Sequence, residues 1–310
     1  ELNDSVSAST DYIFEPSKSE IINDLLPKSL KMQLYKAVRD SFASEHGARM
    51  TAMHKATDNA TELRDQLKLT YNQARQAAIT NEILEINEDR PGSTLVIQTE
   101  DEISAIGMAI GSSLTGVRSA TCTSGPGFVL MIECMSWAGI NEVPVVITFY
   151  QRSGPSTGLP TRHGQDDLLF TVFAGCGDFP KIVYASGDIE ESFYDTGNCF
   201  NYSDKYQIPV IHMMDKFLSS SVVTCKKFNP KKISIDRGKL LDKVEGEYKR
   251  FAFTDDGISP RSKLGMDNGV FWNTGDESDE YGHITEDPQI RIKTVSYTHL
   301  RAHETLRYLV

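Results

Sequence analysis

The sequence predicts an α/β fold, a doubly wound parallel sheet, preceded by a long coiled-coil-like α-helix. Between residues 93 and 213, short apolar, β-rich runs alternate with helical patterns, which is typical of parallel strands covered by helices on both faces. Before them, residues 17–86 carry a helical pattern with no proline between Pro27 and Pro91. After them, residues 217–294 alternate little and predict an irregular extension.

The segment at residues 17–86 is expected to form a rod. Ser17 and Glu20 fit a capping box at its start, and Pro27 allows a break. Apolar or small residues then step by three and four at Tyr35, Val38, Phe42, Met53, Ala56, Ala60, Leu63, Leu67, Ala74 and Ala78. This narrow seam is closer to a coiled coil than to a globular helix. At ~1.5 Å per residue, Lys28 to Ile86 would span roughly 90 Å, and such a rod needs a partner helix to bury its seam.

Five β-rich runs and four helical patterns make up the α/β segment. The expected strands are residues 93–98, 117–122, 143–150, 181–185 and 208–214. The expected helices are residues 103–114, 128–138, 165–173 and 189–206. We therefore divide the chain into a helical rod at residues 1–86, an α/β domain at 87–216, an irregular extension at 217–294 and a tail at 295–310.

The totals exclude several classes of protein. The chain has 310 residues, of which 39% are hydrophobic, and a formal net charge of −11 at pH 7, so we expect a packed core and no nucleic-acid partner. No apolar run approaches the ~20 residues that span a membrane, and no signal peptide opens the chain. The five cysteines form no C-x-x-C pair, so we expect no metal site and no iron–sulfur cluster on this chain. Their odd number and apolar surroundings suit a reducing, cytoplasmic location.

Ligands of open parallel sheets lie beyond the carboxyl ends of the strands, and three segments of this chain fall there. The first is "QTEDEISAIGMAIG", in which Glu100, Asp101 and Glu102 crowd the start of a helix. A solvated acidic cluster favoured by the helix dipole explains at least two of these residues. The alternative is that one carboxylate points into a cleft, where burial and its neighbours raise its pKa.

The second segment is "CTSGPGF", residues 122–128. Gly125, Pro126 and Gly127 allow a tight turn whose backbone N–H groups could face a ligand. A plain turn from strand to helix is an equal alternative.

The third segment is "FYQRSGPSTGLPTRHGQDDL", residues 149–168. Arg152 at the carboxyl end of a buried strand is costly unless it meets an anion, and its guanidinium matches a carboxylate. Thr161 places a hydroxyl in the same loop. The structural alternative is an ion pair with Asp166 or Asp167, and composition does not decide between the two.

Together with "NEVPVVIT", "FPKIVYASGDIEESF" and "YQIPVI", these segments resemble the α chain of archaeal-type 2-oxoacid:ferredoxin oxidoreductases over residues 90–294. The resemblance implies a thiamin-diphosphate enzyme that oxidatively decarboxylates a 2-oxoacid, passes electrons to ferredoxin and releases an acyl-CoA. It implies that the α/β domain is of the type that binds the aminopyrimidine ring of the cofactor.

The same resemblance implies roles for particular residues. Glu102, with Glu100 as the second choice, matches the glutamate that hydrogen-bonds the aminopyrimidine. Arg152 matches the arginine that binds the substrate carboxylate, and Thr161 matches a threonine of the same pocket. The cofactor-binding candidates are Glu102, Glu100, Ser124, Gly125 and Gly127, and the catalytic candidates are Glu102, Arg152 and Thr161.

The sequence departs from a complete enzyme of this family. It has no G-D-G motif followed by an asparagine and no cluster cysteines. We therefore expect Mg²⁺ and the iron–sulfur cluster on a partner β subunit, which would share the thiamin diphosphate, and we expect this chain to be inactive alone. The threonine-bearing loop and the domain that the resemblance places upstream of residue 90 are also absent.

Residues 11–86 resemble a different family, the C-terminal part of the γ subunit of F-type ATP synthase, through strings such as "LYKAVRDSFASEHGARMTAMHKATDNATELRDQLKLTYNQARQAAITNEILEI". The resemblance implies a rotor helix inside the hexamer of catalytic α and β subunits. Its coiled-coil partner, the N-terminal helix of γ, is missing here. Arg75, Gln76 and Thr80 fall where this helix would meet the catalytic subunits.

The two resemblances meet at Ile86–Asn87 without a linker, although fused domains normally have one. The final "VSYTHLRAHE" resembles a translated adaptor read-through at the end of an assembled sequence. Within it, His299 and His303 are four residues apart, and two ligands do not close a zinc site. Our favoured hypothesis is an assembly chimera whose larger part is an oxidoreductase α-chain fragment. The alternatives are a rotor fragment and a chain without function.

Overall fold

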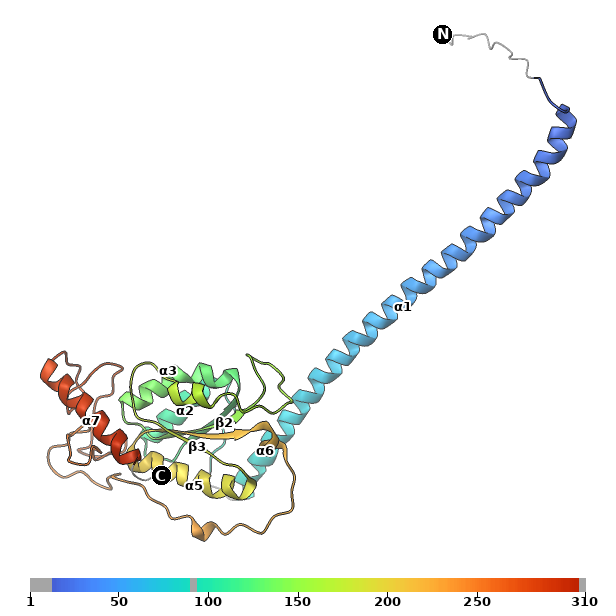
Figure 1. Ribbon diagram of the computed structural model, residues 1–310. Helices are drawn as coiled ribbons and strands as arrows, with labels where there is room; N and C mark the ends of the chain where they lie inside the picture. Colours follow the sequence, from blue (N-terminus) through green and yellow to red (C-terminus); the bar gives the residue numbers. More distant parts are fainter. Residues whose placement is uncertain (1–12, 90–93, 307–310) are drawn as a thin grey trace. The chain divides into compact units, whose positions relative to one another are not determined.

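A computed structural model describes the backbone of residues 13–89 and 94–306 and the side chains of residues 13–71, 94–298 and 300. By its internal contacts the chain divides into two compact units, Glu1–Val96 and Ile97–Val310. The elements (Figure 1) are α1 (Lys18–Asp89), α2 (Glu102–Leu114), β1 (Ala120–Ser124), α3 (Pro126–Ile140), β2 (Val145–Gln151), α4 (Leu168–Phe173), β3 (Ile182–Ala185), α5 (Ile189–Tyr206), β4 (Pro209–Asp215), α6 (Lys216–Ser220), the 3₁₀ helix η1 (Pro230–Lys232) and α7 (Pro288–Leu306).

The described part of the first unit contains one helix, α1, of 72 residues. Ser17 precedes it, and its hydroxyl accepts a hydrogen bond from the backbone N–H of Glu20 at 3.3 Å and donates one to the Glu20 carboxylate at 2.9 Å. Ser17 therefore caps the helix as predicted, but the Glu20 carboxylate accepts from the Ser17 hydroxyl and not from the Ser17 backbone N–H, as a full capping box would require. The helix continues through Pro27, so the break that this proline would allow does not occur. A proline removes only one backbone hydrogen bond, and the leucines and lysines around it favour a helix.

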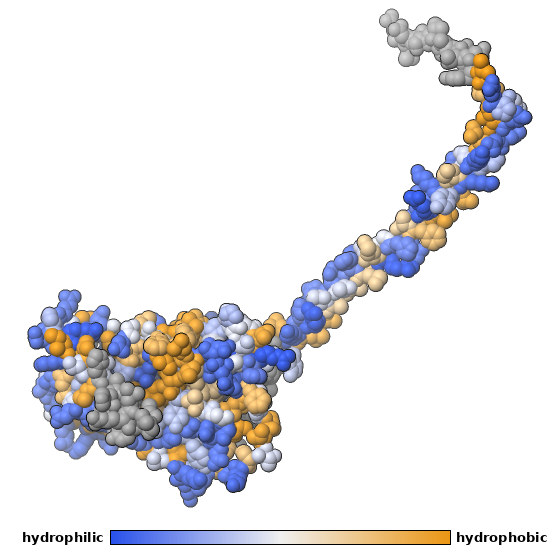
Figure 2. Space-filling view, in the orientation of Figure 1, coloured by the Kyte–Doolittle hydropathy of each residue, from blue (hydrophilic) through white to orange (hydrophobic). Residues whose placement is uncertain are grey.

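Apolar side chains lie exposed along the described length of α1, and Figure 2 shows them as orange atoms among blue ones. They include Leu25, Leu26, Leu30, Tyr35, Val38, Phe42, Met53, Leu63 and Leu67. A helix gains most of its stability from packing such residues against another surface, and no described side chain of the first unit covers them. The side chains of Ala74, Arg75, Gln76, Ala78 and Thr80 lie outside the described residues.

The second unit is built on a parallel four-stranded sheet in the order β1-β2-β4-β3. On one face, Phe128 of α3 and Ile106 of α2 share a buried cluster with Ile147 of β2. On the other face, Tyr206 of α5 shares a second cluster with Val146. Helices thus cover both faces of the sheet, as Figure 1 shows, and the predicted doubly wound α/β fold is confirmed.

One expected strand, residues 93–98, is not a strand in its described part, residues 94–98, so this prediction was wrong. Leu95 within it is 80% exposed. β1 lies at the edge of the sheet and pairs through one side only, with β2. An apolar, β-branched run becomes a strand only where a neighbouring strand pairs with its backbone, and no described segment does so here.

The predicted extension runs irregularly from β4 to α7 and is fastened by buried polar contacts. Arg250, 1% exposed, donates to the backbone oxygen of Glu142 at 2.7 Å and lies 3.3 Å from its carboxylate. α7 begins inside the extension and continues into the tail predicted from residue 295. There the Tyr297 hydroxyl lies 2.9 Å from the Thr254 hydroxyl.

Asp204 of α5 holds three arginines from other parts of the second unit. Its carboxylate lies 2.8 Å from Arg118 Nε, 3.0 Å from Arg237 Nε and 3.0 Å from Arg261 Nη2. The side chains of Asp204 and Arg261 are each 4% exposed. Burial lowers the pKa of Arg261 to about 10, and the Asp204 carboxylate acts in the opposite direction. Because Arg118 precedes β1 and the other two arginines belong to the extension, this network ties α5, β1 and the extension together.

Asp204→Asn is expected to lower the free energy of unfolding of the second unit by roughly 3 kcal/mol, because it leaves buried guanidinium groups without their counter-charge. Chemical denaturation would measure the loss. Asp242→Asn is the matched control, since Asp242 is fully exposed and lies 3.7 Å from Lys263, and it is expected to leave stability unchanged. Equal effects of the two substitutions would contradict this account.

The second unit is expected to unfold at the same denaturant concentration with and without residues 1–96. Both hydrophobic clusters lie entirely within residues 97–310, so their stability does not depend on α1. Both tryptophans, Trp137 and Trp272, belong to the second unit, so tryptophan fluorescence reports it selectively while circular dichroism also reports α1. A shift of the fluorescence midpoint on removal of residues 1–96 would show that the units are coupled.

Candidate active site

The carboxyl ends of β1 and β2 lie next to each other, with Ser124 opposite Tyr150 in the register. We call residues 123–127 the glycine turn: β1 ends in it at Ser124, Gly125 follows, and α3 begins in it at Pro126. β2 passes directly into Arg152. Because adjacent parallel strands end at the same edge of a sheet, the glycine turn and Arg152 meet there.

The guanidinium of Arg152 lies against the backbone of Gly125. A β-carbon at Gly125 would be 2.7 Å from Arg152 Nε and 3.1 Å from its Nη2, and the φ angle of this residue is +56°, a region that favours glycine. The Nε atom is buried and has no hydrogen-bond partner among the described residues. Asp166 and Asp167 make no ion pair with it in the described part of the chain. Arg152 therefore does not form the structural ion pair that was the alternative to an anion-binding role. Its guanidinium is free to meet an anion.

On the same turn, Gly127 lies against Glu102 and Thr123. A β-carbon at Gly127 would be 2.5 Å from Glu102 Oε1 and 2.2 Å from Thr123 Oγ1. Both oxygen atoms therefore occupy the space that a side chain at this position would fill. One five-residue turn thus brings a carboxylate and, at Gly125, a guanidinium to the same edge of the sheet.

The three acidic residues around the start of α2, Glu100, Asp101 and Glu102, have different surroundings. Glu100 is exposed. Asp101 caps α2 by accepting a hydrogen bond from the backbone N–H of Ser104 at 2.8 Å, and this bond lowers the pKa of Asp101. Glu102 is half-buried and is the acid that reaches the glycine turn. Asp101 therefore fits the helix-capping alternative and Glu102 fits the cleft-facing one.

The loop that follows Arg152 is closed by its own backbone. The Leu159 N–H donates to Ser153 O at 3.0 Å, and the Ser153 N–H donates to Arg162 O at 3.4 Å. A β-carbon at Gly164 would be 2.8 Å from the Ser153 nitrogen, so the two arms of the loop pack closely. Thr161 is exposed in this loop and makes no hydrogen bond to a described residue. Its expected place in the substrate pocket stays a prediction.

Two polar contacts fasten the loop to the sheet. Gln151, 8% exposed, accepts a hydrogen bond from the Asp167 N–H through Oε1 at 3.3 Å. Gln165 donates to the Asp215 carboxylate at the end of β4 at 2.8 Å. Neither Gln151 nor Thr123 was a sequence candidate. Their only signal is a polar residue near the carboxyl end of an apolar strand, and such residues are common.

A second polar cluster lies between β4 and α5. Ser186 Oγ donates to the Asp195 carboxylate at 2.8 Å and lies 2.8 Å from His212 Nε2, so the imidazole N–H is the donor in that second bond. Burial lowers the pKa of His212. The serine here stands between the imidazole and the carboxylate, whereas a catalytic triad needs the imidazole in the middle. This cluster therefore serves to join β3, β4 and α5.

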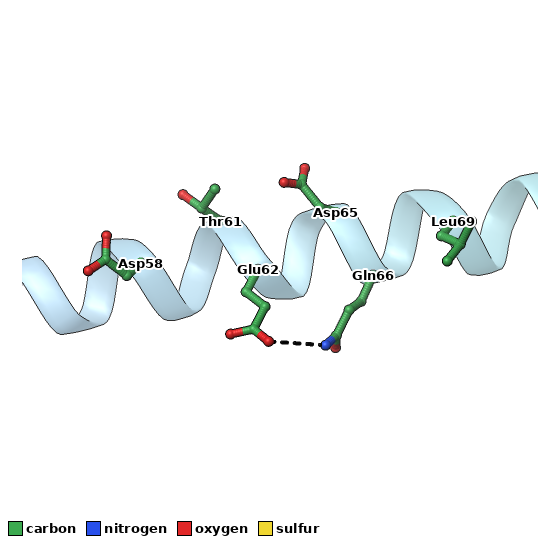
Figure 3. Close-up of a pocket in the computed structure, with 6 residues that line it drawn as sticks. All are labelled: Asp58, Thr61, Glu62, Asp65, Gln66 and Leu69. Carbon is green, nitrogen blue, oxygen red and sulfur yellow. Dashed lines mark hydrogen bonds between the residues drawn. The ribbon is translucent and has the colours of Figure 1, made fainter.

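Two further hollows lie away from the glycine turn. A cavity of about 390 Å³, lined by residues such as Gly139 and Phe179, lies at the opposite end of α3. A shallow surface on α1 (Figure 3) is bordered by Asp58, Thr61, Glu62, Asp65, Gln66 and Leu69. One face of a single helix does not enclose a ligand, so this surface carries no site.

The described residues contain neither a metal-binding cluster nor a membrane-spanning helix. No group of three or more His, Cys, Asp or Glu residues among them is arranged to hold a metal ion. None of their helices combines the length and the apolar character needed to cross a membrane. The His299–His303 pair lies outside the described side chains.

The second unit is an α/β domain with Glu102 and Arg152 at the carboxyl ends of its strands, and comparison with known proteins gives its family. Residues 73–296 match the thiamine-diphosphate-binding family of pyruvate flavodoxin/ferredoxin oxidoreductases. The chain belongs to this family, as the resemblance noted in the sequence implied.

Relatives of this family cover most of the chain. The α subunits of 2-oxoacid:ferredoxin oxidoreductase 1 from Sulfurisphaera tokodaii and Aeropyrum pernix are each 52% identical to it, over 219 and 210 residues. These matches cover 70% and 67% of this chain but 34% and 33% of the relatives. A solved 2-oxoglutarate:ferredoxin oxidoreductase from Magnetococcus marinus is similar with a TM-score of 0.70 and 35% identity, over 76% of this chain and 41% of that one. The chain therefore spans about a third of the length of its curated oxidoreductase relatives.

The first unit has different relatives. Residues 2–88 match the ATP synthase family. The ATP synthase γ chain of Flavobacterium johnsoniae is 83% identical over 86 residues, which cover 27% of this chain and 30% of that protein. Both resemblances stated from the sequence are therefore confirmed, and the two family matches overlap at residues 73–88.

Gly127→Ala is expected to lower the free energy of unfolding by about 1–3 kcal/mol, because the added methyl group collides with Glu102 and Thr123. Gly107→Ala is the matched control, since no atom lies within 4 Å of its would-be β-carbon. In the helix interior of α2 this control is expected to raise stability by up to about 1 kcal/mol. Denaturant titration measures both, and a Gly127→Ala protein as stable as the control would refute the close approach.

Proposed function

We propose that residues 87–294 are a fragment of the α chain of a 2-oxoacid:ferredoxin oxidoreductase. Its reaction is the oxidative decarboxylation of a 2-oxoacid to an acyl-CoA, with ferredoxin as the electron acceptor. The fragment forms the aminopyrimidine side of a thiamin-diphosphate site that a β subunit completes. The observation that carries this proposal is Arg152, whose unpaired guanidinium lies against Gly125, two residues from the glycine that Glu102 lies against.

Arg152 binds the carboxylate that every 2-oxoacid has. A guanidinium has two parallel N–H donors that match two carboxylate oxygens, and Arg152 makes no ion pair with a described residue that would compete. The closed loop after it and the Gly125 backbone limit its motion, so the cation is positioned before the substrate arrives. Thr161 of the same loop adds a hydroxyl to the pocket.

The residues at the turn fit the aminopyrimidine ring of thiamin diphosphate. Glu102 has a half-buried carboxylate without a hydrogen-bond partner among the described residues, and the buried Thr123 hydroxyl beside it is also unpaired. Glu102 would hold N1′ of the ring, with Ser124, Gly125 and Gly127 beside the cofactor and exposed Glu100 as the second choice. When bound, the cofactor supplies the carbanion that attacks the 2-oxo carbon.

The remaining parts of the reaction belong to partners. The Magnetococcus marinus protein is described with 2-oxoglutarate, coenzyme A and succinyl-CoA bound, which supports a 2-oxoacid and CoA as substrates here. We place Mg²⁺, the diphosphate site and the iron–sulfur cluster on the β subunit, because this sequence lacks their motifs. A cytoplasmic location is part of the same proposal.

The first unit supports a second function, that of a rotor-helix fragment of an ATP synthase γ subunit. The exposed apolar side chains of α1 are the specific observation, because they would pack against the N-terminal helix of a γ subunit or the surrounding α and β subunits. We propose that the two functions belong to two different proteins joined near residue 87, and that residues 295–310 are a read-through tail.

Amplification across residues 80–95 from the source DNA, with a read through residue 300, tests this join. Two separate genes would give no product, and each unit would then be assigned to its own protein. A continuous product would overturn the chimera and make the fusion a genuine protein.

Arg152→Ala is expected to lower kcat/KM for the 2-oxoacid at least ~100-fold in the complex with the β subunit, because a charge-assisted contact with the substrate is lost. Arg152→Lys keeps the charge but not the paired donors and is expected to recover part of the loss. Arg162→Ala is the control, since Arg162 is exposed in the same loop. An unchanged kcat/KM in Arg152→Ala would contradict the proposal that Arg152 binds the substrate carboxylate.

A further inference from the structure

Thr123 has a hydroxyl that the fold buries and leaves without a partner. The residue is 8% exposed, and its Oγ1 atom makes no hydrogen bond to a described residue. A buried hydroxyl without a partner destabilises a fold because it has lost its hydrogen bonds to water. Valine has the same shape and suits a strand as well, so packing alone does not explain a threonine at this position.

The Glu102 carboxylate is an acceptor that lies against the same glycine as the Thr123 hydroxyl. Both Oγ1 of Thr123 and Oε1 of Glu102 lie against the same face of Gly127, at 2.2 and 2.5 Å from the place of its missing β-carbon. Both atoms crowd the same point, the buried Thr123 Oγ1 atom has no hydrogen-bond partner among the described residues, and the Glu102 side chain makes no hydrogen bond to a described residue. A change in the Glu102 rotamer therefore suffices to bring donor and acceptor together.

We propose that Thr123 is the positioning residue for Glu102, a role that rests on the proposed function. Its hydroxyl donates a hydrogen bond to one carboxylate oxygen when the aminopyrimidine ring enters the site. This bond fixes the rotamer of Glu102 and leaves the second oxygen for N1′ of the ring. A flexible glutamate would otherwise lose rotamer freedom on binding the cofactor, and a fixed one is already oriented.

The first test uses the chain without cofactor. Thr123→Val removes the hydroxyl and keeps the shape, so its denaturation midpoint is expected to equal or exceed that of the unmodified protein. A hydroxyl that served the fold would instead give a lower midpoint, and that result would overturn the proposal. Thr121→Val is the matched control, because Thr121 is half-buried two residues earlier on β1 and its side chain points to the same face.

The second test uses the complex with the β subunit and two readouts that need no 2-oxoacid, CoA or ferredoxin. They are the dissociation constant of thiamin diphosphate and the rate of deuterium exchange at its C2–H. Thr123→Val is expected to weaken binding or slow exchange about tenfold, and Thr123→Ser is expected to restore both. Thr121→Val is expected to behave as the unmodified chain. Thr123→Ala replaces the valine variant if the latter does not fold.

The outcomes separate this inference from the proposed function. If the unmodified complex binds thiamin diphosphate and exchanges its C2 proton, but Thr123→Val does the same at unchanged rate and affinity, Thr123 has no positioning role and the proposed function remains. If the unmodified complex binds no thiamin diphosphate, the proposed function fails and this inference fails with it. Loss in the valine variant with rescue by serine supports both.

Discussion

The missing β-carbons of Gly125 and Gly127 are the constraint on which the candidate site depends. Each glycine leaves the space of a side chain open, and a charged group from a neighbouring element occupies it: Arg152 from the end of β2 at one, Glu102 from the start of α2 at the other. The separation of cation and carboxylate is thus set by the backbone of one short turn. A backbone is more rigid than a chain of side-chain contacts, so this arrangement favours a fixed distance between the two groups.

The ion pairs and hydrogen bonds that tie the extension to the rest of the second unit lie at the amino ends of the strands, opposite the candidate site. Arg118 precedes β1, and Gln207, which donates to the Ser259 backbone oxygen at 2.5 Å, precedes β4. The extension therefore closes over the amino ends of the strands through Asp204 and Arg250, while the carboxyl ends carry Glu102 and Arg152. This separation lets the site keep unpaired polar groups, since the ion pairs that stabilise the unit are elsewhere.

The alternation of apolar runs and helical patterns was enough to predict the layers, because a strand that is apolar on both faces must be covered on both. Arg152 could likewise be predicted as a site residue, because a charged guanidinium that follows the apolar run "VVITFY" is costly to bury without an anion. The role of Thr123 could not be predicted from the sequence, because threonine is common in strands. Its proposed role depends on its position beside Glu102 at Gly127, which only the structure gives. The strand expected at residues 93–98 was wrong because propensity describes one residue, whereas strand pairing depends on neighbouring strands that a local pattern does not contain.

Residues 94–98, which do not form the expected strand, and α1, whose apolar side chains are exposed, both lack a partner among the described residues. Among the described residues, no strand pairs with the β-forming residues 94–98, and no side chain of the first unit covers the exposed apolar side chains of α1. Sequences that specify a single fold rarely keep two such elements next to each other, because each would gain stability from a partner that the other does not provide. The family matches change between residues 73 and 88, next to both elements. A join between two proteins at that place would have removed the natural neighbour of each element, which supports treating them as parts of separate molecules.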